Sequence, residues 1–280
     1  MKQISGTQVR KELLEKYEKI IKDEQLKIGL AIIQLGDNES SNTYIRNKIK
    51  YTEMVGIHTE LIKLKEETTE EELIELIKKL NKDSKVTGII LQAPVPKQID
   101  FTKCARLIKD EKDVDGFSAG NLFGIRDNQE KMIPCTVKGI LKLLEYYQID
   151  LEGKNVVVIG RSNIVGRPLA DAFINRNATV TLCHSKTKDL EKHTKRADIV
   201  VAAVGKPNLI NKNMVKKGFI GIDVGINMVD GKLVGDFSQD VEEKASYLTP
   251  VPGGVGPMTV AMIIDNLIDL ARIKNASNKE

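Results

Sequence analysis

The residues best placed to handle a proton are Tyr44 and Lys48, four positions apart in the run SSNTYIRNK. On a helix this spacing brings both side chains to one face. A lysine that is removed from water and hydrogen-bonded has a lowered pKa, and it can then exchange protons near neutral pH. A solvated lysine beside a half-buried tyrosine has the same spacing. The pair by itself therefore indicates a candidate general base and not yet a reaction.

A second chemical signature is the segment VVVIGRSNIVGRP, residues 156–168, which has the pattern of a strand, a glycine turn and a helix start. Gly160 permits a tight turn, and the backbone N–H groups at a helix N-terminus attract the pyrophosphate of a dinucleotide. The spacing from Gly160 to Gly166 meets the G-x-G-x-x-G fingerprint only in part. A Tyr-x-x-x-Lys pair is also found in short-chain dehydrogenases, but there the glycine turn comes first. The chain order excludes that family.

The residues after the next predicted strand indicate which dinucleotide is bound. An NAD site has an Asp or Glu about 20 residues beyond the glycine turn, where the carboxylate binds the ribose 2′-OH. This chain has Cys183, His184, Ser185 and Lys186 at that place, without a carboxylate, and Arg161 directly follows the first glycine. Cationic and hydroxyl groups suit a 2′-phosphate. The sequence therefore predicts NADP in preference to NAD.

Short apolar runs alternate with amphipathic patterns along the chain, which is typical of βα units around a parallel sheet. Thr69 and Glu72 form a capping box that predicts the start of a helix. The apolar runs predict strands at residues 28–35, 57–64, 86–91, 155–159, 179–183, 198–204 and 218–224. The periodic segments predict helices at residues 6–22, 41–55, 69–80, 137–147 and 165–175, and a last one from the loop 249–259 to about residue 273.

Two turn-rich stretches, residues 92–98 and 112–121, follow predicted elements at the places where open α/β sheets build their sites. A chain of 280 residues is expected to form two domains. We place the border near Thr136 and expect the last helix to return to the first domain. The predicted fold is α/β, with an N-terminal α/β substrate domain (residues 1–136 and 258–280) and a Rossmann-like NADP-binding domain (residues 137–257).

Composition excludes several classes of protein. With 41% hydrophobic and 29% charged residues, the chain is neither disordered nor a membrane protein, and no apolar run spans a bilayer. A net charge of +4 spread over helix faces and 4% aromatic residues argue against a nucleic-acid partner. Three scattered cysteines and three histidines have no metal-ligand spacing, so we predict no metal. The first residues lack a secretory signal, and a cytoplasmic location is expected.

Several motifs together resemble the methylenetetrahydrofolate dehydrogenase/cyclohydrolase family, and they cover nearly the whole chain in the family's order. Each motif is weak alone, but seven in series are specific. Val137 and Ala93 stand where the family usually has Pro and Leu, and neither departure removes a reacting group. The motifs are SSNTYIRNK, LQAPVP, KDVDG, PCTVKG, GRSNIVGRP, CHSKT and TPVPGGVGPMT.

The resemblance implies a role for individual residues. The family's catalytic pair corresponds to Tyr44 and Lys48, with Gln92 orienting the lysine. Its pterin-binding carboxylate corresponds to Asp115, which we also count among the catalytic residues. The folate-contacting turn corresponds to Pro252 and Gly253. The cofactor-binding residues correspond to Gly160, Arg161, Ser162, Ile164, Gly166, His184, Ser185 and Thr259.

The resemblance also implies a reaction sequence that supplies one-carbon units for purine and related biosynthesis. The enzyme oxidises 5,10-methylenetetrahydrofolate with NADP⁺ and then hydrolyses the methenyl product to 10-formyltetrahydrofolate. The family further implies a homodimer joined through the nucleotide domains. We expect neutral Lys48 to manage the protons of the hydrolysis, and Asp115 to accept hydrogen bonds from the pterin.

Two other readings stay open at the level of sequence. One is a different two-domain NADP oxidoreductase, such as a shikimate-dehydrogenase-like protein, which would lack the combination of Tyr44, Lys48 and PGGVGP. The other is an NADP-binding sensor on a degenerate enzyme scaffold. A sensor has no need of Lys48, Gln92 and Asp115, so their presence favours an enzyme.

Overall fold

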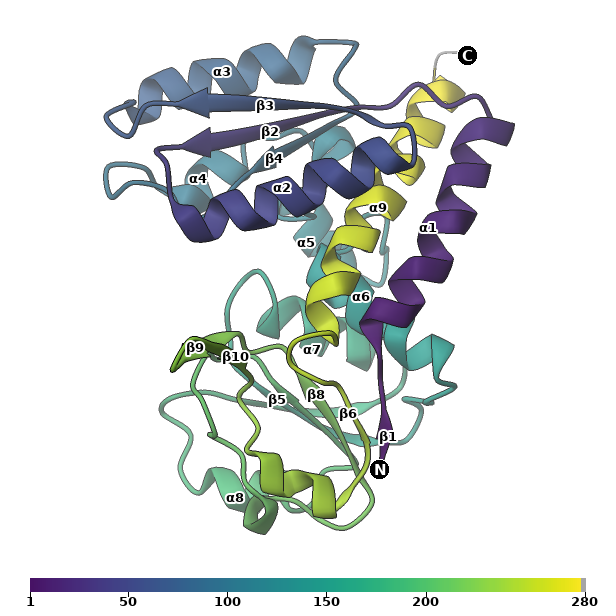
Figure 1. The fold of residues 1–280 in the computed structure, drawn as a ribbon, viewed down its shortest axis with the longest axis vertical. Coiled ribbons are helices and arrows are strands. Elements are labelled where there is room, and N and C mark those ends of the chain that lie inside the picture. Colours follow the sequence, from purple (N-terminus) through teal and green to yellow (C-terminus); the bar gives the residue numbers. More distant parts are fainter. Residues whose placement is uncertain (278–280) are drawn as a thin grey trace. The chain divides into compact units, whose positions relative to one another are not determined.

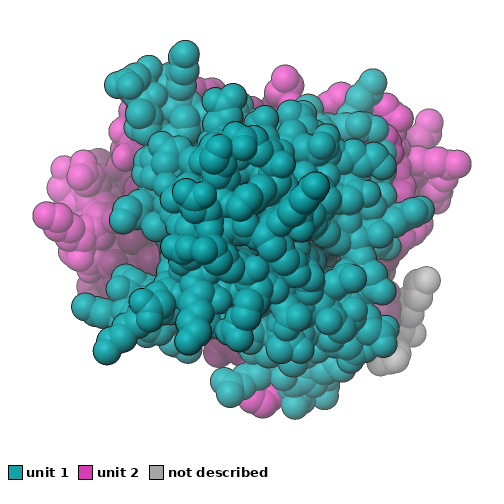
Figure 2. Space-filling model, turned by 90° about the horizontal axis from the view of Figure 1, so that it is seen from below, with its two compact units in different colours: residues 1–11, 125–129, 136–259 teal, residues 12–124, 130–135, 260–280 magenta. Residues whose placement is uncertain are grey.

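Two parallel sheets organise the chain in the computed structural model, which describes residues 1–277 (Figure 1). The chain divides into two compact units, coloured separately in Figure 2. Unit 1 comprises residues 1–11, 125–129 and 136–259, and unit 2 comprises residues 12–124, 130–135 and, within the described part, 260–277. The last three residues of the predicted segment 258–280 lie outside the described residues. The functional domain borders given above stay a prediction.

Unit 2 is built on a three-stranded sheet in which both strand pairs are parallel. Its strand order is β3 (His58–Leu64), β2 (Gly29–Leu35), β4 (Gly88–Leu91). All three strands were predicted, with borders that differ by one or two residues. The helical segments that begin in this unit are α2 (Glu39–Met54), α3 (Glu70–Lys82), α4 (Phe101–Ala105), η1 (Asp110–Lys112), α5 (Ala119–Arg126) and, by its first residue alone, α6 (Cys135–Tyr146).

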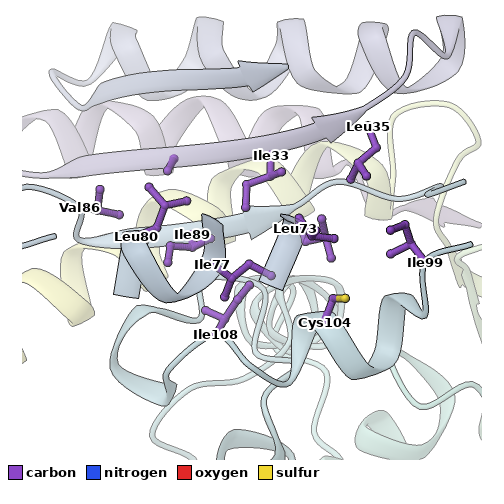
Figure 3. Packing of buried hydrophobic residues seen from close by; sticks show 12 residues of the cluster. Ile33, Leu35, Leu73, Ile77, Leu80, Val86, Ile89, Ile99, Cys104 and Ile108 are labelled. Atoms are coloured by element: carbon purple, nitrogen blue, oxygen red, sulfur yellow. The ribbon is translucent and has the colours of Figure 1, made fainter. Parts of the chain in front are cut away.

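Successive side chains of β2 point to opposite faces of this sheet, and a different helix covers each face. Ala31, Ile33 and Leu35 belong to a buried cluster with residues of α3, β4 and α4 (Figure 3). The residues between them therefore point to the opposite face. There Gln34 donates from Nε2 to Asn42 Oδ1 of α2 at 2.8 Å. Helices α2 and α3 thus cover opposite faces, as the ribbon shows (Figure 1).

The C-terminal part of α9 (Val255–Ser277) packs in unit 2, which confirms the expected return of the last helix. Asn266 is fully buried and donates from Nδ2 to the carbonyls of Val114 (2.8 Å) and Ile133 (3.1 Å). A Cβ on Gly88 of β4 would lie 2.6 Å from Leu267 Cδ2. A glycine is needed there because the helix lies close against the strand.

Unit 1 contains a six-stranded sheet in which every neighbouring pair is parallel. From β5, the chain first adds β6 on one side and then β7, β8 and β11 on the other. This is a doubly wound order, and such sheets bind ligands at the carboxyl ends of the strands where the order reverses. That point lies between β5 and β7. The strand order is β1 (Lys2–Gln3), β11 (Ala245–Leu248), β8 (Phe219–Asp223), β7 (Ile199–Ala202), β5 (Asn155–Ile159), β6 (Thr179–Cys183).

Four strands of unit 1 were not predicted. These are β1, β11 and the hairpin formed by β9 (Asn227–Val229) and β10 (Lys232–Val234). The hairpin turns at Asp230 and Gly231, both with positive φ. The helical segments are α6 (Cys135–Tyr146), α7 (Gly166–Ile174), α8 (Leu190–Thr194), η2 (Lys212–Met214), η3 (Gln239–Glu243) and the first turns of α1 (Gly6–Asp23) and α9.

Three further observations concern the described residues alone. None of their helices has the length and apolar character needed to cross a membrane. They contain no group of three or more His, Cys, Asp or Glu side chains arranged to hold a metal ion. Cys104, Cys135 and Cys183 are buried thiols that form no disulfide.

Candidate active site

Helix α2 is fixed at its first turn by bonds to neighbouring loops. Asn38 caps the helix by accepting the backbone N–H of Ser41 at its side chain, at 3.1 Å. The Ser41 hydroxyl in turn donates to the carbonyl of Ala93 at 3.2 Å. Ala93 follows β4, so the helix that carries Tyr44 and Lys48 is tied to the loop at the carboxyl end of that strand.

Lys48 is directed inward, whereas Tyr44 lies at the surface. Lys48 is 9% exposed and Tyr44 is 45% exposed. Lys48 Nζ donates to Gln92 Oε1 at 3.0 Å, and Gln92 donates from Nε2 to the Ala93 carbonyl at 2.6 Å. The second bond fixes the orientation of the amide, so that its oxygen faces the lysine. Gln92 therefore holds Lys48 in place.

Asp115 lies close enough to Lys48 for the two charges to interact. It is half-buried, and burial raises the pKa of its carboxyl above the usual value. The positive charge of Lys48 opposes that rise, and the nearby Asp113 carboxylate adds to it. The structure thus brings Lys48, Gln92 and Asp115 together within unit 2.

The loop that presents Asp115 is organised by Asp113, which sequence reasoning did not single out. Asp113 is 1% exposed and accepts the backbone N–H of Ser118 (2.6 Å) and the Asn121 side-chain amide (3.0 Å). Gly116 has a φ of +73°, and a Cβ there would lie 2.7 Å from the Pro134 nitrogen. The stretch KDVDG is therefore a fixed loop, and Asp113 sets its shape.

The predicted cofactor turn follows β5 in unit 1. Gly160 has a φ of +115°, and a Cβ there would lie 2.4 Å from the Ala203 carbonyl oxygen. A Cβ on Gly166 would lie 1.9 Å from the Gly160 oxygen. Both positions require glycine because the turn is folded so closely. Ser162 accepts the N–H groups of Val165 (3.2 Å) and Gly166 (3.4 Å) at Oγ, where α7 begins.

The predicted cofactor residues around this turn are accessible. Arg161, Ser162 and Ile164 are all exposed. After β6, the turn 184–187 is closed by a bond from the His184 N–H to Thr187 Oγ1 at 2.8 Å. His184 Nδ1 accepts the Lys186 N–H at 3.1 Å, and Ser185 and Lys186 are exposed. Residues 183–188 include no carboxylate.

The loop before α9 is held by the start of the chain. The Gly253 carbonyl accepts the Thr7 N–H at 3.0 Å, and Gly253 has a φ of +108°. A Cβ on Gly6 would lie 1.8 Å from the Gly254 oxygen. Pro252 is exposed, and Gly253 and Thr259 are half-buried. These predicted residues belong to unit 1, whereas Tyr44, Lys48, Gln92 and Asp115 belong to unit 2.

Sequence profiles of one family match both parts of the chain. The profile described as "Tetrahydrofolate dehydrogenase/cyclohydrolase, catalytic domain" matches residues 4–115, and that described as "Tetrahydrofolate dehydrogenase/cyclohydrolase, NAD(P)-binding domain" matches residues 134–275. The chain belongs to the tetrahydrofolate dehydrogenase/cyclohydrolase family. The resemblance inferred from the motifs is confirmed.

Individual relatives agree with this family membership. The chain is 47% identical over 268 residues to the "Bifunctional protein FolD" of Aliarcobacter butzleri. The aligned residues cover 95% of this chain and 93% of that protein. The crystal structure of the bifunctional FolD enzyme from Campylobacter jejuni superposes with a TM-score of 0.95 at 43% identity, covering 98% and 99% of the two chains. The Trypanosoma brucei FolD structure, complexed with NADP cofactor and inhibitor, gives a TM-score of 0.91 at 33% identity, covering 97% of each chain.

Proposed function

We propose that the chain oxidises 5,10-methylenetetrahydrofolate with NADP⁺ and hydrolyses the resulting methenyltetrahydrofolate to 10-formyltetrahydrofolate. Family membership supports this pair of reactions in one-carbon metabolism. The observation that carries the proposal is the buried Lys48, bonded to the Gln92 amide oxygen at 3.0 Å and close enough to Asp115 to act on its pKa. This arrangement suits proton handling at a folate, which a cofactor-binding sensor does not require.

The residues after β5 and β6 fit an NADP molecule. The Gly160–Gly166 turn is folded so closely that a Cβ at either glycine would clash with backbone, and helix α7 begins directly after it. Arg161, Ser185 and Lys186 are exposed beside a segment without carboxylates, as a 2′-phosphate requires. We assign the pyrophosphate to the glycine turn and the 2′-phosphate to these side chains. When bound, NADP⁺ supplies the hydride acceptor for the first reaction.

The oxidation needs little acid–base catalysis from the protein. Its residues must hold the bridging carbon of the folate in contact with the nicotinamide, because hydride transfer depends on alignment. The Asp115 carboxyl accepts hydrogen bonds from the amino and ring N–H groups of the pterin. The surface position of Tyr44 makes its ring available to the same substrate. The family motifs assign a folate contact to Pro252 and Gly253 as well.

The hydrolysis needs one group that moves protons. Water adds to the methenyl carbon and loses a proton. The hydroxyl left on that carbon loses its own proton as the formyl C=O forms and the carbon–nitrogen bond opens. One proton is taken up by the released ring nitrogen, and the other is released to solvent. Lys48 in its neutral form takes the proton from water at Nζ and returns it to the nitrogen. Gln92 Oε1 keeps the Nζ lone pair and protons correctly directed.

We further propose a homodimer joined through unit 1. Its hairpin β9–β10 presents large apolar side chains to solvent, with Met228 67% and Leu233 40% exposed. Exposed apolar groups gathered on one element are typical of protein contacts. Size-exclusion chromatography with light scattering measures the mass directly. A mass equal to one chain at assay concentrations would contradict the dimer.

Absorbance assays on the purified protein test the proposed function. Methylenetetrahydrofolate is supplied with NADP⁺, and the formation of NADPH and of the methenyl compound is followed separately. Methenyltetrahydrofolate alone is then supplied to measure its hydrolysis. We expect turnover in both assays. Tight NADP binding without turnover in either assay would favour a sensor, and turnover of a substrate other than a folate would favour another oxidoreductase.

A further inference from the structure

The loop that follows β7 directs three consecutive backbone N–H groups at one carboxylate. Val204 N (2.8 Å) and Gly205 N (3.1 Å) donate to Asp236 Oδ2, and Lys206 N (2.7 Å) donates to Asp236 Oδ1. Asn227 adds a fourth bond from its side-chain amide at 3.1 Å. Asp236 is fully buried. Four N–H groups thus stabilise a carboxylate inside the protein.

Successive N–H groups that converge in this way form a concavity suited to anions. In many proteins such a concavity binds a phosphate, but here a side chain of the same chain occupies it. The amides of residues 204–206 are therefore satisfied internally and are not free to bind a phosphate of the cofactor. The occupied concavity also fixes the backbone of the loop, since each N–H has a set direction.

This loop borders the glycine turn at the point where the strand order reverses. A Cβ on Gly160 would lie 2.4 Å from the Ala203 oxygen and 3.3 Å from Val204 Cγ1. The Val204 side chain is 41% exposed. Ala203 and Val204 therefore pack against Gly160, and a shift of the loop by about one or two ångströms would either clash with the glycine turn or remove the atoms against which the turn packs.

Asp236 is itself held by a second buried carboxylate, Asp223, at the end of β8. Asp223 accepts the N–H groups of Asp236 (2.9 Å) and Phe237 (3.0 Å). Two glycines allow the close approach: a Cβ on Gly225 would lie 2.1 Å from Asp236 Oδ1, and one on Gly235 would lie 1.9 Å from Asp223 Oδ2. The position of Asp236 at the base of the β9–β10 hairpin is therefore determined from several sides.

We propose that Asp236 is a positioning residue for the dinucleotide cofactor. It holds the Val204–Lys206 loop in the conformation against which the Gly160 turn packs. Its carboxylate also occupies the loop amides, so that they do not compete with the glycine turn for the pyrophosphate. Asp236 acts through the loop and does not touch the cofactor. This inference rests on the proposed function only in taking the Gly160 turn as the cofactor site.

The test compares Asp236→Asn with Asp198→Asn in the full-length protein. The first variant places an amide –NH₂ against N–H donors that need an acceptor. Asp198 is the matched control because it accepts the Asn155 N–H at 2.8 Å directly before β7, at the amino ends of the strands of the same sheet. The readouts are the Kd and KM for NADP⁺, the KM for methylenetetrahydrofolate and the hydrolysis of methenyltetrahydrofolate, which uses no NADP⁺.

For Asp236→Asn we expect the Kd and KM for NADP⁺ to rise about tenfold or more. The KM for the folate and the hydrolysis rate should stay within about twofold of the wild type, as should every readout of Asp198→Asn. Unchanged NADP⁺ binding in Asp236→Asn would overturn the proposal. An equal loss of hydrolysis, or an equal rise in the Kd of Asp198→Asn, would also overturn it, because either result indicates a general structural role.

Amide hydrogen exchange in the wild-type protein without NADP⁺ decides the matter if Asp236→Asn does not fold. We expect slow exchange at Val204, Gly205 and Lys206, whose N–H groups are bonded to Asp236. Fast exchange there would overturn the proposal. Failure of the proposed function and failure of the Asp236 proposal give different results. A wild-type protein that binds NADP⁺ without turnover contradicts the proposed function. In that case the Kd of Asp236→Asn for NADP⁺, compared with the Kd of the wild type, still tests the role of Asp236.

Discussion

Gln92 connects Lys48 to the backbone of the loop after β4, since it accepts from Lys48 Nζ at 3.0 Å and donates to the Ala93 carbonyl at 2.6 Å. One amide therefore sets the position of the lysine relative to the sheet. The positive charge of the same lysine also lowers the pKa of Asp115. The proposed proton chemistry depends on this small group.

Removing the amide should impair hydrolysis more than oxidation. In Gln92→Leu, Lys48 loses its acceptor and part of its orientation, so we expect the kcat for methenyltetrahydrofolate hydrolysis to fall about 10- to 100-fold. NADPH formation should fall much less. Gln98→Leu is the matched control, because the Gln98 amide donates to the carbonyls of Glu66 and Thr68, at a place away from Lys48. Equal loss of both activities in Gln92→Leu would contradict the assignment.

A methyl group at the glycine turn should weaken cofactor binding selectively. Gly160→Ala puts a Cβ 2.4 Å from the Ala203 oxygen at a φ of +115°. We expect NADP⁺ affinity to fall about tenfold or more, with hydrolysis retained. Gly153→Ala is the control, because its φ is +68° but nothing lies within 4 Å of the added Cβ. That variant should keep its NADP⁺ affinity, as measured by titration calorimetry. It should lose about 1 kcal/mol of folding stability.

NADP⁺ should be used better than NAD⁺. We expect kcat/KM to favour NADP⁺ by about one to several powers of ten, because a cation near the 2′-phosphate forms charge-assisted hydrogen bonds. Arg161→Ala should narrow this ratio by lowering kcat/KM for NADP⁺ alone. The NAD⁺ value of the same variant serves as the internal control. Comparable values for both cofactors in the wild type would contradict the roles given to Arg161 and His184.

The Asp223 carboxyl should titrate near neutrality. Burial and the charge of Asp236 raise its pKa from 3.8 to about 6, in spite of three backbone N–H donors. The folded protein then binds this proton more tightly than the unfolded chain. The resulting stability is fully present below about pH 4 and is lost as the pH rises through about 6, a change of roughly 3 kcal/mol.

The ¹³Cγ chemical shift of Asp223, followed against pH, gives its pKa directly. Asp223→Asn identifies the resonance. The free energy of unfolding of the wild type, minus that of the variant, should decrease from pH 4 to pH 7. A midpoint below about pH 4.5 would show that the N–H donors outweigh burial.

Local signals in the sequence were sufficient for most of the elements. The capping box of Thr69 and Glu72 is confirmed, with bonds of 2.8 and 3.2 Å between the two residues. Apolar runs marked the buried strands because their hydrophobic residues are contiguous. The hairpin β9–β10 was missed although Asp230 and Gly231 form a favoured turn pair, because its strands are short and exposed.

Long-range contacts could not be predicted in the same way. The strand β1 has two residues and pairs with Tyr247 and Leu248 near the other end of the chain. The sequence indicated the pairing of Lys48 with Gln92 only through the family motifs, since 44 positions separate the two residues. Asp113 and Asp236 look like ordinary surface carboxylates in the sequence. Their roles become visible only when the N–H groups that surround them are located.

The central claim is that Lys48 moves the protons of the hydrolysis and is dispensable for hydride transfer. The most direct measurement is the rate of both reactions in purified Lys48→Met, with Lys50→Met, an exposed position on the same helix, as the control. We predict that methenyltetrahydrofolate hydrolysis is lost while NADPH formation stays measurable, and that the control resembles the wild type. Equal retention of both activities in Lys48→Met would contradict the account.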